Sequence, residues 1–429
     1  MDHYPLAKAQ RSGDALAVES SNDAKMPSFR VALRFWLKLG LISFGGPAGQ
    51  IAIMHRELVD ERRWISEQHF LNALNFSMLL PGPEAQQLAT YLGWRLHGVR
   101  GGIAAGGLFV LPAMILLFGL CLVFVLGGEL PWLAAIFKGL QAAVMAIVTH
   151  ALLKIGRRSL RSLFLVLIAI AAFVAIFVFK ISFVWIILGA GMLGYLGSQL
   201  LARQFPSHGK ISDGSVESSF LKLPPPPRAS FLRTLKIIGV GTPLWVFPIL
   251  LFGLVLGWDS TLAQEAIFFS KASMVTFGGA YAVLPYVAQQ AVEVHGWLDH
   301  LQMMSGLALA ETTPGPLVIV LQFVGFMGGW NHPGNWSPWL AAAVGSLVTC
   351  WATFVPCFMF IFIGGPHVEG LSQQPRISAA LGAITAAVVG VIANLAAILG
   401  IHALWPVGGS FELGLLVLAI VAFIALQFF

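Results

Sequence analysis

The stretch LLPGPEAQQL, from Leu79 to Leu88, interrupts an otherwise apolar segment with two prolines, a glycine, a carboxylate and two amides. Its flanks have the composition of a membrane-spanning helix, whereas proline lacks a backbone N–H and breaks a helix interior. Backbone groups freed by such a break are costly in hydrocarbon, where no water can bond them. We therefore expect the break to face protein or a water-filled cavity inside a membrane protein.

The composition places the whole chain in the membrane. Of its 429 residues, 57% are hydrophobic and 10% are charged, and the mean hydropathy is +0.82. Apolar runs of about 20 residues, the length that crosses a bilayer, recur along the chain. The sequence predicts an all-α polytopic membrane protein in contact with the lipid bilayer. Its net charge of +6 is not gathered in a basic domain, so no nucleic-acid partner is expected.

Enzyme and metal chemistry find no support in the residue pattern. The three cysteines, Cys121, Cys350 and Cys357, lie in apolar segments without a CxxC pair or a Cys/His cluster. Neither a nucleophile paired with a base nor a redox-cofactor motif is present at membrane depth. We expect no disulfide, no metal site, no cofactor and no catalytic residue.

An internal repeat is visible as three motifs that recur at one constant spacing, which we call the repeat offset. SFGG at 43–46 matches TFGG at 276–279, Trp64 matches Trp297, and PGP at 81–83 matches PGP at 314–316. After an insertion near WNHPGNWSP, FVLP at 109–112 resembles TFVP at 353–356. Three anchors at one offset indicate a duplicated unit, and in transporters such repeats locate the binding site.

The repeat and the composition divide the chain into four parts. They are a disordered cytoplasmic tail over 1–28, a first repeat over 29–201, a cytoplasmic proline-rich linker over 202–233 and a second repeat over 234–429. The apolar segments are 29–53, 70–95, 102–126, 132–153, 162–180, 183–201, 235–257, 263–289, 302–329, 338–363, 376–401 and 411–428.

The placement of Lys and Arg orients the repeats. Basic residues flank the first two segments and fill the linker, which are cytoplasmic by the positive-inside rule. The equivalent second-half loops, around 293–300 and 330–339, contain no Lys or Arg. We interpret the first two segments as broken hairpins that re-enter the cytoplasmic face, and their second-half equivalents as hairpins from the opposite face. The alternative is that all four segments span the membrane, which would leave the repeats inverted as well. The two repeats are thus expected to be inverted, with both termini cytoplasmic.

The breaks are expected to bind an anion. A proline after a flexible glycine starts a new half-helix, whose unpaired N–H groups and positive dipole end attract negative charge. Glutamine amides follow each first-half break and can donate to an oxyanion without a buried ammonium. The substrate-binding residues that we predict are Gly45, Gly46, Gln50, Pro81, Gly82, Pro83, Gln86, Gln87, Gly278, Gly279 and Gly315.

Two carboxylates beside the PGP motifs are candidates for coupling to protons. Glu84 follows the first motif and Glu311 precedes the second. We favour Glu84 as the proton carrier, because the helix N-terminus favours its charge while a bound dianion opposes it. Capping of the half-helix is the alternative role for Glu84. Four basic residues, His55, Arg56, Arg62 and Arg63, either anchor the chain at the membrane surface through paired charges or serve in gating.

Several stretches resemble the signature motifs of the chromate ion transporter family, the ChrA-type proteins. They are FGGPAGQIAIMHRELVDERRWI, PGPEAQQLATYLGW, TFGGAYAVLPYVAQQ and TTPGPL. The resemblance covers both halves and suggests a long-chain member with two fused domains, although the second half lacks the charged cluster after FGG. It implies a multi-pass protein of the bacterial inner membrane that exports chromate from the cytoplasm and confers chromate resistance. Sulfate is the related oxyanion, and both are tetrahedral dianions of similar size.

Other functions stay open at this point. An anion channel would share the broken helices and a central anion site, but export against a gradient needs coupling to protons or a counter-anion. A transporter of sulfate or another oxyanion is the second alternative. The oligomeric state, including a homodimer, does not follow from the sequence.

Overall fold

The computed structural model describes residues 26–127, 130–200, 230–277, 280–367, 375–406 and 410–428, which form helices and short connections without a strand. The predicted all-α class is confirmed for these residues. The predicted tail and linker lie outside the described residues, apart from 26–28 and 230–233. Gly278 and Gly279, predicted to bind substrate, also lie outside them.

Two runs of helices follow the two halves of the chain. The first run is α1 (Phe29–Ile42), α2 (Gly46–His55), η1 (Arg56–Glu61), α3 (Glu67–Leu79), α4 (Glu84–Gly127), α5 (Pro131–Ser159), α6 (Leu163–Phe177) and α7 (Phe183–Leu200). The second run is α8 (Phe231–Val255), α9 (Thr261–Val275), α10 (Ala280–Ala288), η3 (Gln289–Val294), α11 (His300–Thr312), η4 (Leu317–Ile319), α12 (Val320–Asn331), α13 (Pro338–Gly364), η5 (Gly365–His367), α15 (Pro375–Leu404) and α16 (Leu413–Phe428).

Helices break at the predicted motifs. Between α1 and α2 the chain turns at Gly45, whose φ of +86° suits glycine. Between α3 and α4 it turns at Gly82, with a φ of +126°. Pro47 and Pro83 stand beside the starts of the new helices, where a missing N–H costs nothing.

Matched elements share their limits at the repeat offset. The π-helical turns η1 and η3 begin and end at equivalent positions of the two repeats, and so do the helices α3 and α11. Both π turns lead into a residue with positive φ, Arg63 at +51° and Gly296 at +63°. The next helix is capped in each half by a side chain, Ser66 in α3 and Asp299 in α11.

The helix α4 doubles back on itself. Its backbone leaves helical geometry at His97 and at Gly98, which has a φ of +64°, so a kink stands where the sequence predicted a loop between two segments. A side chain at Gly93 would meet the backbone of Gly101, and one at Gly106 would meet Thr90. The stretch after Glu84 therefore runs antiparallel to the stretch after the kink.

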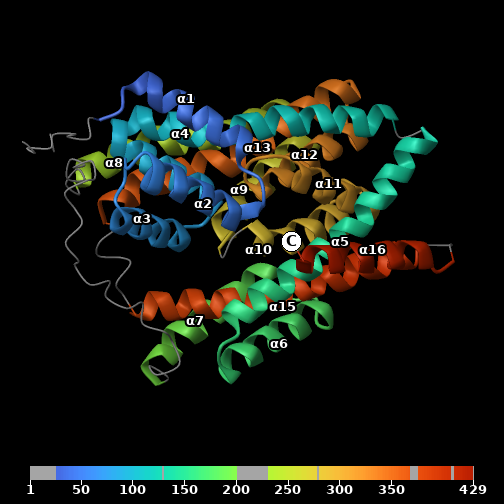
Figure 1. The fold of residues 1–429 in the computed structure, drawn as a ribbon. Coiled ribbons are helices and arrows are strands. Elements are labelled where there is room, and N and C mark those ends of the chain that lie inside the picture. Colours follow the sequence, from blue (N-terminus) through green and yellow to red (C-terminus); the bar gives the residue numbers. More distant parts are fainter. Residues whose placement is uncertain are drawn as a thin grey trace, which may run out of the picture.

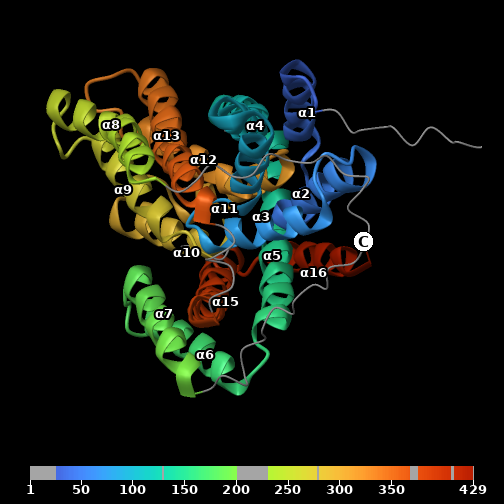
Figure 2. The same ribbon diagram turned by 90° about the vertical axis from the view of Figure 1, so that its left-hand side faces the viewer.

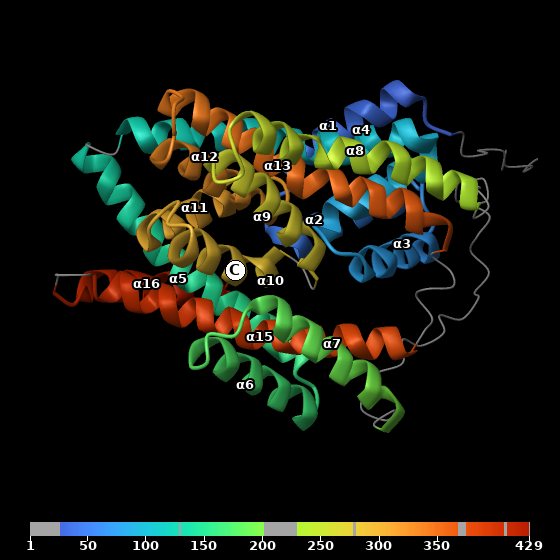
Figure 3. The ribbon, with the colours of Figure 1, turned by 180° about the vertical axis from the view of Figure 1, so that it is seen from behind.

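The helices form two layers (Figure 1). The upper block holds α1 to α4 and α8 to α13, while the lower layer holds α6, α7, α15, α16 and the C-terminal part of α5 (Figures 1 and 3). Within the lower layer α15 packs on α5, α6 and α7, and α16 packs on α5, while α10 and α11 reach α15 from the upper block (Figure 2). The motif-bearing helices thus lie in the upper block, next to the lower layer.

Five helices of the described residues are long and apolar enough to cross a membrane. They are Glu84–Gly127, Ala135–Ser159, Phe231–Val255, Pro338–His367 and Arg376–Leu404. Shorter apolar helices cover Leu163–Phe177, Phe183–Gly197, Leu317–Asn331 and Leu413–Gln427. The broken helices α1, α2, α9 and α10 are too short to span a bilayer alone.

Candidate functional site

The breaks of the two halves bond to each other. The N–H of Gly82 donates to the carbonyl of Thr276 at 2.7 Å, and the N–H of Gly315 donates to the carbonyl of Ser43, also at 2.7 Å. Gly315 and Thr276 are the repeat equivalents of Gly82 and Ser43, so the two bonds are reciprocal. All four residues are buried. We call this group of four residues the crossing.

Gln50, a residue of the first half, forms hydrogen bonds to two residues of the crossing. Its Nε2 donates to the carbonyl of Gly315 and, at 3.4 Å, to the carbonyl of Ser43. The side chain is 1% exposed, and its Oε1 has no hydrogen-bond partner among the described residues. A buried acceptor without a partner is costly. The Gln50 amide therefore joins the two halves and keeps one unused oxygen in the interior.

Gln87 is bonded within the first PGP turn. Its Nε2 donates to the carbonyl of Pro81 at 2.6 Å. A Cβ added at Gly82 would lie 2.6 Å from Cys357 Sγ and 2.7 Å from Gln87 Nε2, so glycine is required by space as well as by φ. Gln87 and Gly82, both predicted to bind substrate, thus lie together at the crossing.

Gln86 lies apart from Gln87. Its Nε2 donates to Thr90 Oγ1 at 3.2 Å, and it faces Gly106 across the doubled α4. Neighbouring residues of a helix point about 100° apart, which separates two amides that the sequence grouped. Like Gln87, Gln86 is fully buried and leaves its Oε1 without a partner among the described residues.

The two candidate coupling carboxylates have different surroundings. Glu84 is the first residue of α4, is half-buried, and forms no hydrogen bond or ion pair within the described residues. The positive charge of Arg158 on α5 acts on it from a distance. Glu311 instead accepts a hydrogen bond from the Tyr281 hydroxyl at 2.7 Å. Only Glu84 is therefore free to respond to a nearby ligand without first breaking a bond to a described residue.

Glu57 pairs with two basic residues, one on either side of the first break. Its carboxylate is 4% exposed and pairs with Lys38 Nζ at 2.6 Å and with Arg62 Nε at 3.2 Å. Burial alone would raise the pKa of Glu57, but the bonds and charges of Lys38 and Arg62 outweigh it and hold that pKa below its ordinary value. The Arg62 guanidinium also lies over the rings of Phe35 and Trp64, 5.0 and 5.2 Å from their centroids.

The remaining basic candidates lie at the same turn. His55 Nε2 lies 2.6 Å from Glu67 Oε2, and Arg56 Nε lies 3.4 Å from Glu61 Oε1. Arg63 follows with its positive φ and forms no ion pair among the described residues. The first pair connects α2 with α3, and the second lies within η1. The arrangement agrees with the surface-anchor interpretation, while a gating role stays a prediction.

One fully buried carboxylate was not among the site residues predicted from the sequence. Glu265 of α9 is fully buried, and neither of its oxygens has a hydrogen-bond partner among the described residues. It lies against Gly328 of α12 and Gly345 of α13, where any side chain would collide with it. Its repeat equivalent is Ala32, so the repeat pattern gave no signal for it. The sequence feature that could have identified Glu265 is a single carboxylate within an otherwise apolar helix.

Both halves of the chain resemble one known protein family. The family described as “Chromate transporter” matches two separate segments, residues 31–195 and 263–429. No solved structure matches the chain.

Three similar relatives match over most of their length and most of this chain. The probable chromate transport protein of Synechococcus elongatus is 31% identical over 392 residues, which are 91% of this chain and 89% of the relative. The chromate transport protein of Pseudomonas aeruginosa is 34% identical over 88% of this chain and 82% of its own length. That of Cupriavidus metallidurans is 28% identical over 90% and 86%.

Proposed function

The chain belongs to the chromate transporter family and is a multi-pass membrane transporter, not an enzyme; from this premise we propose that it exports chromate from the bacterial cytoplasm across the inner membrane. Export of a toxic oxyanion would confer chromate resistance. The names of the three relatives support chromate as substrate, and sulfate has the same shape and charge.

The observation that carries the proposal is the reciprocal pair of bonds at the crossing. Gly82 and Gly315 each satisfy a carbonyl of the other half, at 2.7 Å. Two broken segments that bond to each other at membrane depth form the kind of irregular backbone that persists only inside protein or beside a cavity. The helices α2 and α4 start beside it, and their N-terminal dipoles favour an anion. We place the dianion there.

The two halves are proposed to be inverted repeats. The matching limits of η1 with η3 and of α3 with α11 support a common architecture. The doubled α4 supports a re-entrant path for the segment that follows the first PGP motif. The absence of Lys and Arg from the loops 293–299 and 330–339, against their abundance in 54–66, supports opposite faces. Both termini would then be cytoplasmic.

Coupling is proposed to run through Glu84. A dianion bound at the start of α4 would repel the Glu84 carboxylate and favour its neutral form, so proton binding and substrate binding would be linked. Glu311 is assigned a gating or hydrogen-bonding role, because Tyr281 already donates to it.

Uptake of labelled chromate and sulfate into everted membrane vesicles tests the function. We expect chromate to accumulate against its gradient when a proton gradient is imposed, and accumulation to collapse with an uncoupler. Flux that only runs downhill would identify a channel instead. Accumulation of sulfate without chromate would identify another oxyanion transporter.

A further inference from the structure

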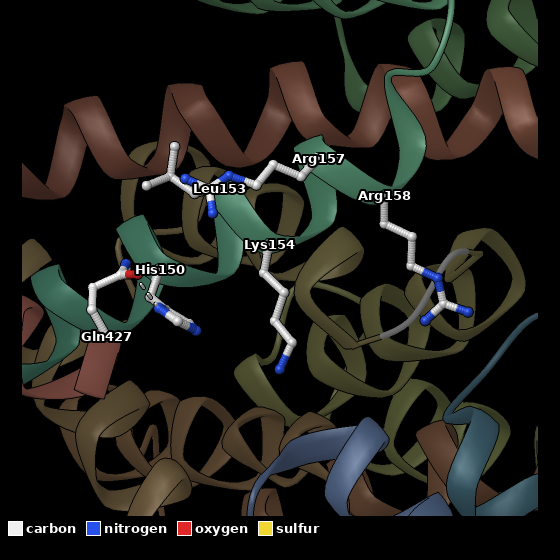
Figure 4. Close-up of a pocket in the computed structure, with 6 residues that line it drawn as sticks. All are labelled: His150, Leu153, Lys154, Arg157, Arg158 and Gln427. Carbon is white, nitrogen blue, oxygen red and sulfur yellow. Dashed lines mark hydrogen bonds between the residues drawn. The ribbon is translucent and has the colours of Figure 1, made fainter. Parts of the chain in front are cut away.

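Four polar side chains near the end of α5 line one cavity. His150, Lys154, Arg157 and Arg158 surround it together with Leu153 of the same helix and Gln427 of α16, and its volume is about 490 Å³ (Figure 4). Residues 150, 154, 157 and 158 recur at helical spacing, so they share one face of α5. Lys154 and Arg158 extend to the same side of the helix (Figure 4).

The three permanently charged residues of this face have no carboxylate within ion-pair distance among the described residues. Lys154, Arg157 and Arg158 are exposed and form no ion pair within the part of the chain that the structure describes. Among the residues that the structure describes, no Asp or Glu lines the cavity. Like charges one turn apart destabilise a helix, so an uncompensated row needs another reason to persist.

Membrane orientation explains only part of this pattern. Basic residues at a cytoplasmic helix end satisfy the positive-inside rule, and they suit the negative end of the α5 dipole. Neither effect requires them to line up over two turns along the wall of a single cavity. A surface that concentrates one sign of charge in a hollow attracts ions of the opposite sign.

The cavity lies beside the proposed substrate path. It opens on α5, which contacts α11 of the upper block as well as α15 and α16 of the lower layer. Arg158 at its rim is the charged group that acts on Glu84, the first residue of the half-helix after the PGP motif. One charged residue of the cavity thus acts on the start of α4, where we position the anion.

We propose that His150, Lys154, Arg157 and Arg158 form an anion vestibule, which captures a tetrahedral oxyanion dianion and delivers it to the crossing. This inference rests on the proposed function. Arginine offers paired donors to two oxygens of such an anion, and lysine adds a point charge. Because the side chains are exposed, the vestibule would hold the anion loosely and release it quickly.

Initial transport rates in everted vesicles test the vestibule. We expect Lys154→Gln combined with Arg158→Gln to raise the KM for chromate about tenfold, because electrostatic capture changes the rate of encounter by about that factor. The double variant should also lose most of the salt dependence of kcat/KM. The matched control is Lys236→Gln, which removes an exposed charge from α8. An unchanged KM in the double variant, or an equal change in the control, would overturn the proposal.

Charge restoration separates capture from membrane orientation. Cys121, Cys350 and Cys357 are buried, so Lys154→Cys offers one accessible thiol among the described residues. Purified Lys154→Cys would be modified in detergent and then reconstituted. A reagent that adds a positive group should restore the wild-type KM, whereas one that adds a sulfonate should raise it further. Equal KM values after both reagents contradict the vestibule. If wild-type protein transports no oxyanion at all, the proposed function fails instead.

Discussion

The two broken regions of the molecule share a backbone and differ in chemistry. In both, a helix ends just before the FGG motif, a π turn follows, and a PGP glycine with positive φ donates to the opposite half. The two reciprocal bonds of this common geometry join backbone groups, and the PGP glycines supply the positive φ that the turns require.

Polar side chains distinguish the first region. Gln50, which clamps the crossing, has Val283 as its equivalent, and Gln87 has Val320. The pattern extends to the π turn, where Arg62 lies over Trp64 in the first half. In the second half the ring of His295 stacks on Trp297, with centroids 4.4 Å apart. The polar side chains at the crossing thus come mainly from one repeat, which supports our proposal that this repeat binds the anion.

The largest expected effect comes from the feature that both regions share. Gly82→Ala and Gly315→Ala should each lower chromate export at least about tenfold, because an alanine at φ of +126° or +98° is strained by about 1–3 kcal/mol. The new methyl group would also meet Cys357 Sγ or Ala113 Cβ, each 2.6 Å away. Vesicle uptake, normalised to the amount of protein in the membrane, measures this.

Gly107→Ala is the control for these glycine variants. Its added methyl group meets nothing within 4 Å, and the residue lies inside α4. It should export chromate like the wild type. If Gly82→Ala is impaired and Gly315→Ala is not, export does not require both halves of the crossing equally, which contradicts this prediction.

The next effect should appear in the first region alone. Gln50→Leu removes the donor to the carbonyls of Gly315 and Ser43, which is worth about 1–3 kcal/mol in a buried site. We expect export to fall roughly tenfold, since about 1.4 kcal/mol corresponds to that factor. Val283→Ala trims the matched side chain without removing a hydrogen bond and should retain most activity. Similar losses in both variants would indicate a packing role for Gln50.

The carboxylates beside the two PGP motifs, Glu84 and Glu311, should differ in their effect on pH-driven export. Glu84→Gln keeps the shape of the side chain but cannot titrate, so chromate binding should survive while export driven by a pH gradient is lost. Glu311→Gln should retain pH-driven export, because the Tyr281 hydroxyl can still donate to the amide oxygen. Binding to purified protein and vesicle uptake over a range of pH measure the two effects. Unchanged pH dependence in Glu84→Gln would rule out this coupling role.

Local motifs predicted the breaks, but not the contacts that join them. FGG and PGP predicted the turns at Gly45 and Gly82, since glycine and proline act on their immediate backbone. The bond from Gly82 to Thr276 joins positions in opposite halves of the chain, and no local pattern encodes such a pairing. Gln86 and Gln87 are adjacent in the sequence and were predicted to act together. In the helix, however, Gln86 bonds to Thr90 and Gln87 bonds to Pro81.

A buried carboxylate gives an expected gain in stability rather than a loss. Glu265→Met replaces a side chain whose two oxygens have no partner among the described residues with an apolar one of similar length. Its equivalent in the first region is Ala32, so the shared backbone does not require a carboxylate there. We expect the free energy of unfolding to rise by about 1–3 kcal/mol. Thermal unfolding in detergent measures the change, and Glu265→Ala, which leaves a cavity, should be less stable than Glu265→Met.

The smallest expected effect distinguishes the two π turns by their response to acid. Glu57, whose pKa is lowered by Lys38 and Arg62 against the opposing effect of burial, has the uncharged Gln290 as its equivalent. Because the folded-state pKa lies below the unfolded value, the ionised carboxylate stabilises the protein above the unfolded pKa of about 4.5. That stabilisation is lost as the pH falls through the folded-state pKa. Glu57→Gln should therefore be less stable than the wild type at pH 7, by about 1 kcal/mol since Lys38 is half exposed.

The difference between wild type and Glu57→Gln should shrink as the pH is lowered toward about 3, because the protonated wild-type residue then resembles the amide. Thermal unfolding in detergent at a series of pH values measures it. Glu61→Gln is the matched control, since its pair with Arg56 is exposed at both ends and such pairs contribute little. A gap between wild type and Glu57→Gln that stays constant with pH would mean that the Glu57 charge does not stabilise this turn, and the two regions would then differ in shape alone.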